Sequence, residues 1–151
     1  MTRESSWEHV YQASRYAFQQ ENAWISFVLE GLGPSEISWI PSVTLLTAWN
    51  PGSVEHSLAQ NRVANAALLR DLVGRSLGWV PARGSSLPQV EPAWQEEGFA
   101  IFGLSRREAA TLGQEWQQRA VVFLCGHAAE LVWCADASFT ACGMCIQKTA
   151  Q

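Results

Sequence analysis

Two asparagines, Asn61 and Asn65, stand one helical turn apart in the segment expected to form the longest helix of the chain. At roughly 100° per residue, both fall inside the arc of apolar side chains that should face the core. That arc consists of Val54, Leu58, Leu68, Leu69 and Leu72. An amide offers two donors and two acceptor lone pairs, and its burial is costly unless these are hydrogen-bonded. The pair therefore predicts a fixed polar partner opposite the helix: a loop, a ligand or a backbone edge.

The segment 47–51, with the sequence TAWNP, is the expected partner because it leads from a strand into the same helix. Pro51 disfavours the helical conformation at Asn50, which predicts a turn there. The strand end, the turn and the start of the helix would leave backbone N–H groups pointing outward, an arrangement that favours anions and carboxylates. The alternative is that the asparagines only satisfy backbone groups of the turn. Thr47 and the three asparagines are therefore candidates either for ligand binding or for bracing.

Four further side chains complete the predicted site. Glu96 precedes an apolar strand and is the candidate general base; the alternative is a solvated loop carboxylate. Gln118 ends a helix and is a candidate ligand-binding residue, with a capping or sheet-edge role as the alternative. Trp49 and Trp94 would supply a stacking surface for a nucleotide or another planar metabolite.

We expect no metal site; the candidates for one are Cys142 and Cys145, and the alternative is that they belong to an apolar tail of small residues. All four lie near the end of the chain, and Cys142 and Cys145 have the spacing of a metal or redox pair. A zinc site would require a second close pair, which Cys125 and Cys134 do not form. The sequence also contains no GxSxG, GxxxxGK[ST], GxGxxG or HExxH motif, so we expect no cofactor.

The elements that must position these residues follow from periodicity and turn signals. The expected helices cover residues 6–19, 54–72 and a third segment opened by Ser105 and Glu108, which fit a capping box. The expected strands cover residues 24–29, 43–49, 79–80, 99–103, 120–124 and 131–134. Residues 31–34 indicate a turn, and residues 81–88 a flexible stretch.

Paired strands alternate with helices in this order, which is typical of the α+β class. We therefore predict a single compact domain over residues 1–151. It should have a mixed or mainly antiparallel sheet of about five to six strands, with about three helices.

Composition limits the possible partners. The chain of 151 residues is 48% hydrophobic and 16% charged, as in globular proteins. Its formal net charge of −4 and the lack of any Lys/Arg run disfavour nucleic acid as a partner. No apolar stretch approaches the ~20 residues needed to span a bilayer, and the N-terminus lacks the apolar region of a signal peptide. We therefore expect no membrane association and a cytoplasmic location; the oligomeric state is not predicted.

Several of these segments together resemble the bacterial DUF3293 family. They are the TAWNP segment, the spaced pair Asn61 and Asn65, Trp94-x-Glu96, residues 99–103 and Gln118-x-Ala120. The resemblance covers residues 10–135 and leaves the cysteine-containing tail, residues 136–151, outside. It implies a small, stand-alone bacterial domain without an established activity. It also implies one shared site, made of Thr47, Asn50, Asn61, Asn65, Glu96 and Gln118.

Three functional hypotheses follow. The first is a binding domain for a small polar or nucleotide-like ligand, oriented by the asparagines and stacked on tryptophans. The second is a hydrolase- or transferase-type enzyme that uses Glu96 as general base. The third is a protein-interaction module, because eight tryptophans exceed the need of one core and some could be exposed. Finding Trp39, Trp79 and Trp133 on one accessible surface would favour this third hypothesis.

Overall fold

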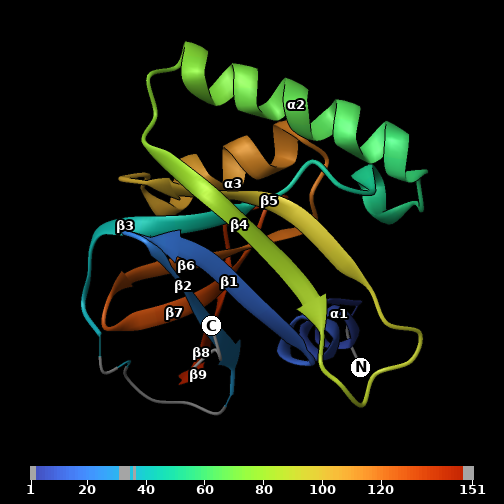
Figure 1. Ribbon diagram of the computed structural model, residues 1–151. Coiled ribbons are helices and arrows are strands. Elements are labelled where there is room, and N and C mark those ends of the chain that lie inside the picture. Colours follow the sequence, from blue (N-terminus) through green and yellow to red (C-terminus); the bar gives the residue numbers. More distant parts are fainter. Residues whose placement is uncertain (1–2, 31–34, 36, 148–151) are drawn as a thin grey trace.

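The computed structural model of the protein describes residues 3–30, 35 and 37–147, and within these residues the chain forms three α-helices and nine strands (Figure 1). The helices are α1 (Arg3–Gln12), α2 (Leu58–Gly74) and α3 (Arg106–Glu115), with a 3₁₀ turn, η1 (Pro51–Ser53), before α2. The strands are β1 (Ser14–Gln20), β2 (Ala23–Leu29), β3 (Trp39–Leu46), β4 (Trp79–Ser86), β5 (Gln95–Phe102), β6 (Ala120–Gly126), β7 (Ala128–Trp133), β8 (Phe139–Cys142) and β9 (Met144–Gln147).

The described strands form one antiparallel sheet in the order β8-β7-β6-β3-β5-β4-β1-β2-β9. β8 and β9 stand at opposite ends of this order, yet only Gly143 separates them in the chain. Because one residue spans only about 3.6 Å, the sheet must curl until its two edges approach each other. The predicted sheet of about five to six strands, mixed or mainly antiparallel, is therefore wrong in its strand number: the described residues build a nearly closed, barrel-like, antiparallel sheet of nine.

The sequence analysis did not predict three of the strands, β1, β8 and β9. The helix predicted over residues 6–19 ends at Gln12, and the chain then continues as β1. β1 pairs with β2 on one side and β4 on the other, and this pairing overrides the helical spacing of its apolar residues. The predicted tail, residues 136–151, contributes β8 and β9, which are too short to show a clear periodic pattern. They close the sheet by pairing with β7 and β2.

β4 is longer than the strand predicted at residues 79–80. It continues to Ser86, through most of the stretch 81–88 that was expected to be flexible. Its backbone pairs with both β1 and β5. These hydrogen bonds keep the glycine- and serine-containing segment extended, although its side chains do not show the alternating apolar pattern of a strand. The turn predicted at residues 31–34 lies outside the described residues.

Side chains alternate between two hydrophobic cores, one on each face of the sheet. In β5, Phe99 and Ile101 belong to the core beneath the helices, which we call the outer core. Ala100 belongs to the core inside the curled sheet, which we call the inner core. Leu68 and Leu72 of α2 are fully buried in the outer core. The largest fully buried members of the inner core are Phe18, Phe27, Leu29, Leu124 and Leu131.

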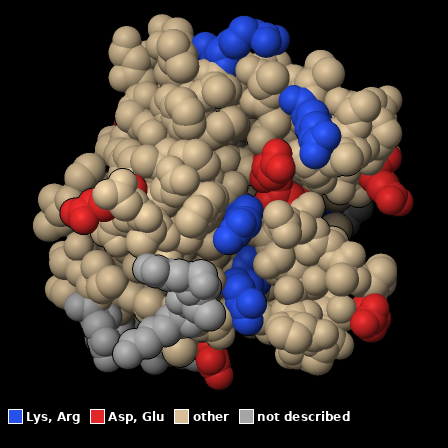
Figure 2. Space-filling view, in the orientation of Figure 1, with Lys and Arg blue, Asp and Glu red and all other residues tan. Residues whose placement is uncertain are grey.

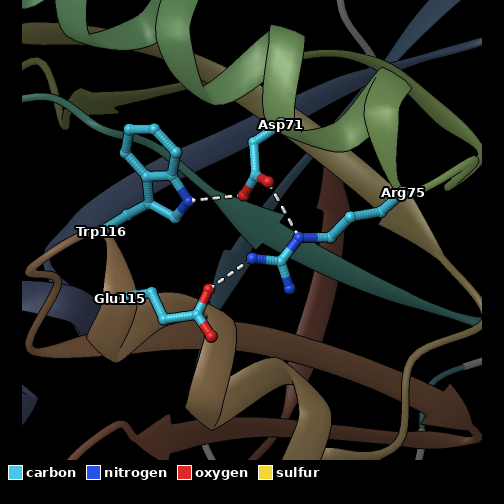
Figure 3. A network of polar contacts seen from close by, with 4 residues as sticks. All are labelled: Asp71, Arg75, Glu115 and Trp116. Carbon is cyan, nitrogen blue, oxygen red and sulfur yellow. Dashed lines mark hydrogen bonds and ion pairs between the residues drawn. The ribbon is translucent and has the colours of Figure 1, made fainter.

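A polar network joins the C-terminal ends of α2 and α3 above the outer core (Figure 3). Asp71 accepts hydrogen bonds from Arg75 Nε at 2.9 Å and from Trp116 Nε1 at 3.1 Å. Arg75 Nη2 also donates to Glu115 Oε2 at 2.6 Å. The hydrogen bond from Arg75, helped by that from Trp116, holds the pKa of Asp71 below its ordinary value. The network therefore fixes the two helices to each other by ionised groups.

Capping boxes set the start of both helices. The box predicted at Ser105 and Glu108 is confirmed at the start of α3. The helix predicted over residues 54–72 begins later, because Ser57 and Gln60 form a second capping box. The residues between the TAWNP segment and this cap include the turn η1 and do not extend the helix.

Charge is sparse on the face shown in Figure 2, where most of the described surface carries no charged side chain. Basic and acidic side chains occur there as separate small groups. None of the described helices is long and apolar enough to cross a bilayer.

Candidate functional site

Two buried amides hold the turn that follows β3. Asn65 Oδ1 accepts from the Ala48 N–H at 3.1 Å, and its Nδ2 donates to the Glu97 carbonyl oxygen of β5 at 3.1 Å. Asn61 Oδ1 accepts from the Asn50 N–H at 2.8 Å, and its Nδ2 donates to Asn50 Oδ1 at 2.9 Å. Asn61 is 2% and Asn65 7% exposed, so the prediction that both amides are buried is confirmed. We call Asn61 and Asn65 the asparagine clamp.

The other polar residues of the turn bond to its own backbone and to β5. Thr47 Oγ1 donates to the Glu97 carbonyl at 2.6 Å and accepts from the Trp49 N–H at 3.0 Å. Asn50 adopts the left-handed conformation, φ 45° and ψ 59°, which asparagine tolerates better than most residues. Its Oδ1 also accepts from the His56 N–H at 2.9 Å. Asn50 is thus held by the clamp and, through its own side chain, also holds the backbone of the turn.

The segment after α3 secures the same turn from the other side. Gln118 Nε2 donates to the Trp49 carbonyl at 3.2 Å, and the Gly52 N–H donates to the Gln117 carbonyl at 2.8 Å. The N–H groups of residues 48–50 and 52 are therefore all bonded within the chain. The expectation that they point outward and attract an anion is wrong for this turn.

Gly98 lets the turn lie directly against β5. A Cβ at this position would stand 2.5 Å from the Leu46 carbonyl oxygen and 3.1 Å from Thr47 Cβ. Only glycine leaves room for so close an approach of two backbones. The contact brings the neighbouring Glu97 carbonyl within reach of Thr47 and Asn65.

A pocket of about 340 Å³ opens beside this turn, between α1 and one end of the curled sheet. Its volume lies within the range of about 300–1,000 Å³ found for small-molecule sites. The predicted site residues in its wall are Thr47, Trp49, Asn50, Trp94, Glu96 and Gln118. Asn61 and Asn65 do not line it; they contact the turn from α2. Thr47, Asn50 and Gln118 thus both hold the turn and line the pocket, whereas Asn61 and Asn65 only hold the turn.

Gly84 forms part of the floor of this pocket. It pairs with Tyr16 of β1 and with Glu96 of β5, so the three residues stand in one row across the sheet. A Cβ on Gly84 would meet Trp94 Cζ3 at 3.7 Å and Tyr16 Cδ1 at 3.9 Å. Because glycine has no side chain, space remains between the two aromatic rings beside Glu96.

Glu96 is a half-buried carboxyl group without compensation. Burial raises its pKa from the ordinary 4.5 to about 7. Within the described chain, the carboxyl accepts no hydrogen bond and forms no ion pair. Burial also raises the pKa of Tyr11 and of Tyr16, and Glu96 adds to both shifts, so the carboxyl faces neutral phenols. Glu96 is thus a proton-exchanging group near neutral pH.

Arg119 is a second charged group of the pocket wall that forms no ion pair in the described chain. Its guanidinium carbon lies 4.3 Å from the centroid of the Trp7 ring of α1. Its Nε is buried and donates to no acceptor in the described part of the chain. Arg119 and Glu96 form no ion pair with each other among the described residues. A donor and an acceptor of opposite charge therefore face one pocket separately.

Sequence reasoning missed Arg119, Tyr11 and Tyr16 as pocket residues. Both tyrosines fell within the helix predicted over residues 6–19; Tyr11 does lie in α1, whereas Tyr16 lies in β1. Arg119 belongs to no motif; the available signal was its position directly before an apolar strand, next to the predicted Gln118. Its position before β6 places the side chain at the end of the sheet where the pocket lies.

None of the tryptophans is fully exposed in the described chain. Trp39 and Trp133 are each 5% exposed, and Trp79 packs against the outer core. The remaining five are buried or half-buried, namely Trp7, Trp24, Trp49, Trp94 and Trp116. The observation on which the interaction-module hypothesis depended is therefore absent from the described residues.

The cysteine pair does not form a compact ligand set. Cys142 is buried at the end of β8, whereas Cys145 is exposed on β9. Among the residues that the structure describes, no group of three or more His, Cys, Asp or Glu side chains could hold a metal ion.

These features define a curled antiparallel sheet with helices outside it and a pocket at one end, beside a turn held by buried asparagines. The model of the family described as "Protein of unknown function (DUF3293)" matches residues 46–121, about half of the chain. The chain belongs to the DUF3293 family, as the resemblance indicated. The matched span contains the clamp, Glu96 and Arg119, whereas α1 and β1 complete the pocket from outside it. Comparisons with curated proteins and with solved structures gave no match.

Replacing Asn65 by alanine should lower the free energy of unfolding by about 1–3 kcal/mol, because the Ala48 N–H and one bond to the Glu97 carbonyl lose their buried partner. Chemical denaturation measures this change. Arg70→Ala, on the exposed face of the same helix, is the control and should change stability by less than about 0.5 kcal/mol. Equal effects of the two substitutions would contradict the clamp.

Glu96→Gln should stabilise the protein at high pH. A folded-state pKa raised from 4.5 to about 7 means that wild-type stability is fully present below pH 4.5 and falls as pH rises through 7. Glutamine cannot ionise, so the variant should be about 1–3 kcal/mol more stable than wild type at pH 8 and nearly equal at pH 4. Denaturation at both pH values tests this, with Glu97→Gln, an exposed neighbour, as control. An unchanged pH dependence would refute the burial of a charged Glu96.

Proposed function

We propose that this DUF3293 protein binds a small, planar, polar ligand in the pocket between α1 and the turn after β3. The observation that supports it most is the pair of uncompensated polar groups, Glu96 and Arg119, in one wall. Leaving such groups without partners is costly, so their retention in a pocket favours a binding role. Trp49 and Trp94 line the same pocket and offer ring surface for stacking.

The proposal divides the predicted site residues by task. Asn61, Asn65 and Thr47 use their polar atoms on the turn and on β5, so they position the wall. Thr47, Asn50 and Gln118 belong to both groups, because each braces the turn and also lines the pocket. Because strands from both ends of the described chain close the same sheet, we propose that these parts fold as one domain.

Blocking the pocket should abolish binding without unfolding the protein. Gly84→Leu places a side chain between Trp94 and Tyr16, where the first added carbon meets ordinary contact distances of 3.7 and 3.9 Å. A set of small planar polar compounds would be screened by ligand-observed NMR. We expect compounds that bind wild type and lose about tenfold or more in affinity for the variant.

Gly74→Leu is the matched control, because a Cβ at Gly74 meets nothing within 4 Å. Circular dichroism would verify that both leucine variants are folded. If no compound in the set distinguishes wild type from Gly84→Leu, the proposed function is refuted.

A second candidate function is proton-transfer catalysis by Glu96, which its pKa of about 7 favours. A group of this pKa exchanges protons readily at neutral pH, and it faces the pocket in which a substrate would lie. Compounds that bind would be incubated with the protein and followed by NMR for conversion. Conversion that disappears in Glu96→Gln, while binding persists, would establish an enzyme; binding without conversion leaves the protein a binding domain.

A further inference from the structure

The two uncompensated groups of the pocket restrict the chemistry of its ligand. Glu96 and Arg119 shift the pKa of Tyr11 in opposite directions, so both lie near its phenol. They nevertheless form no ion pair with each other in the described chain. A ligand with hydrogen-bond donors in one part and a negatively charged acceptor in another would satisfy both the ionised carboxylate and the guanidinium.

The donor end must be flat. Trp94 lies against Gly84, which stands in the same row of the sheet as Glu96, so a group that reaches the carboxylate from this floor meets an indole ring. The two oxygens of a carboxylate are best matched by two adjacent N–H donors. Guanine offers a ring N–H beside an amino group, whereas adenine offers an amino group beside a ring acceptor.

The anionic end is set by Arg119. Its guanidinium is a planar fork that matches the oxygens of a phosphate, and stacking on Trp7 at 4.3 Å fixes the plane of that fork. Arg119 is half-buried, lines the pocket and forms no ion pair among the described residues, so its terminal N–H groups are the donors that a phosphate oxygen would meet. The pocket volume of about 340 Å³ suits a mononucleotide better than a small amino acid.

We propose that the pocket takes a guanine nucleotide, with the base stacked near Trp94 and its two N–H donors on Glu96, and with the phosphate on Arg119. This inference rests on the proposed binding function and names the ligand class of the same pocket. The base and the phosphate are recognised by different side chains, so each half can be tested separately.

The test compares guanosine monophosphate (GMP), adenosine monophosphate (AMP) and guanosine as ligands, by calorimetric titration at pH 8, where Glu96 is ionised. Wild type should bind GMP about tenfold or more tightly than either of the others. AMP lacks the paired donors for Glu96, and guanosine lacks the phosphate for Arg119.

Each variant should remove one preference and keep the other. Glu96→Gln should abolish the preference for GMP over AMP while GMP still binds more tightly than guanosine. Arg119→Gln should do the reverse. Arg119→Lys retains a cation beside Trp7 and so controls for structural effects of losing the contact with α1. This variant should bind guanosine as wild type does and bind GMP more weakly, because lysine lacks the planar fork that matches a phosphate.

Two exposed residues outside the pocket wall serve as controls: Glu97→Gln removes a negative charge, as Glu96→Gln does, and Arg70→Gln removes a positive charge, as Arg119→Gln does. Both should leave the affinities for GMP, AMP and guanosine unchanged. Equal binding of AMP and GMP by wild type overturns the proposal, as does a GMP preference that survives in Glu96→Gln. If the screened compounds bind at Gly84 and no guanine nucleotide competes with them, the guanine assignment fails and the binding function stands. If nothing distinguishes wild type from Gly84→Leu, the binding function itself fails.

Discussion

The geometry of the site depends on two buried amides of α2. Asn61 and Asn65 satisfy the backbone of the turn after β3 and tie it to the Glu97 carbonyl of β5. The neighbour of that carbonyl, Glu96, projects on the pocket face of the same strand. The clamp therefore holds the turn against the strand that carries Glu96, with Gly98 allowing the approach, and the pairing of β5 with β4 places Glu96 opposite Gly84.

The polar groups around the pocket fall into two kinds. The polar groups of the turn form hydrogen bonds within the chain, and each such bond contributes about 1 kcal/mol to stability. Glu96 and Arg119 do not, and Glu96 is destabilising when ionised because burial raises its pKa to about 7. A folded chain that tolerates such a cost beside a cavity is typical of a site whose function needs the group.

Much of the clamp could be predicted from the sequence, because it is local. The angular position of Asn61 and Asn65 in an apolar arc indicated their burial, and the capping box at Ser105 marked the start of α3. The sheet could not be predicted to the same degree, since β1, β8 and β9 are defined by pairing with strands distant in sequence. The sequence pattern of residues 14–18 fits a helix as well as a strand, and the partners decide between them.

The same limit applies to the pocket. Glu96 was identified as a candidate, but its uncompensated burial and its separation from Arg119 emerge only once α1, β1 and β6 close around it. Only the complete fold shows that Asn50 lines the pocket, whereas Asn61 and Asn65 contact the turn from α2. A pattern within one helix gives burial, whereas the identity of the buried partner comes from elements far away in the chain.

Hydrogen exchange of the turn amides tests the clamp most directly. The Ala48 and Asn50 N–H groups follow a strand end, where amides usually exchange fast unless bonded to buried partners. In wild type they should exchange nearly as slowly as the core amides of β3, and the Glu55 N–H should exchange fast. Asn65→Ala should speed Ala48, and Asn61→Ala should speed Asn50. Fast exchange of both amides in wild type would contradict the account.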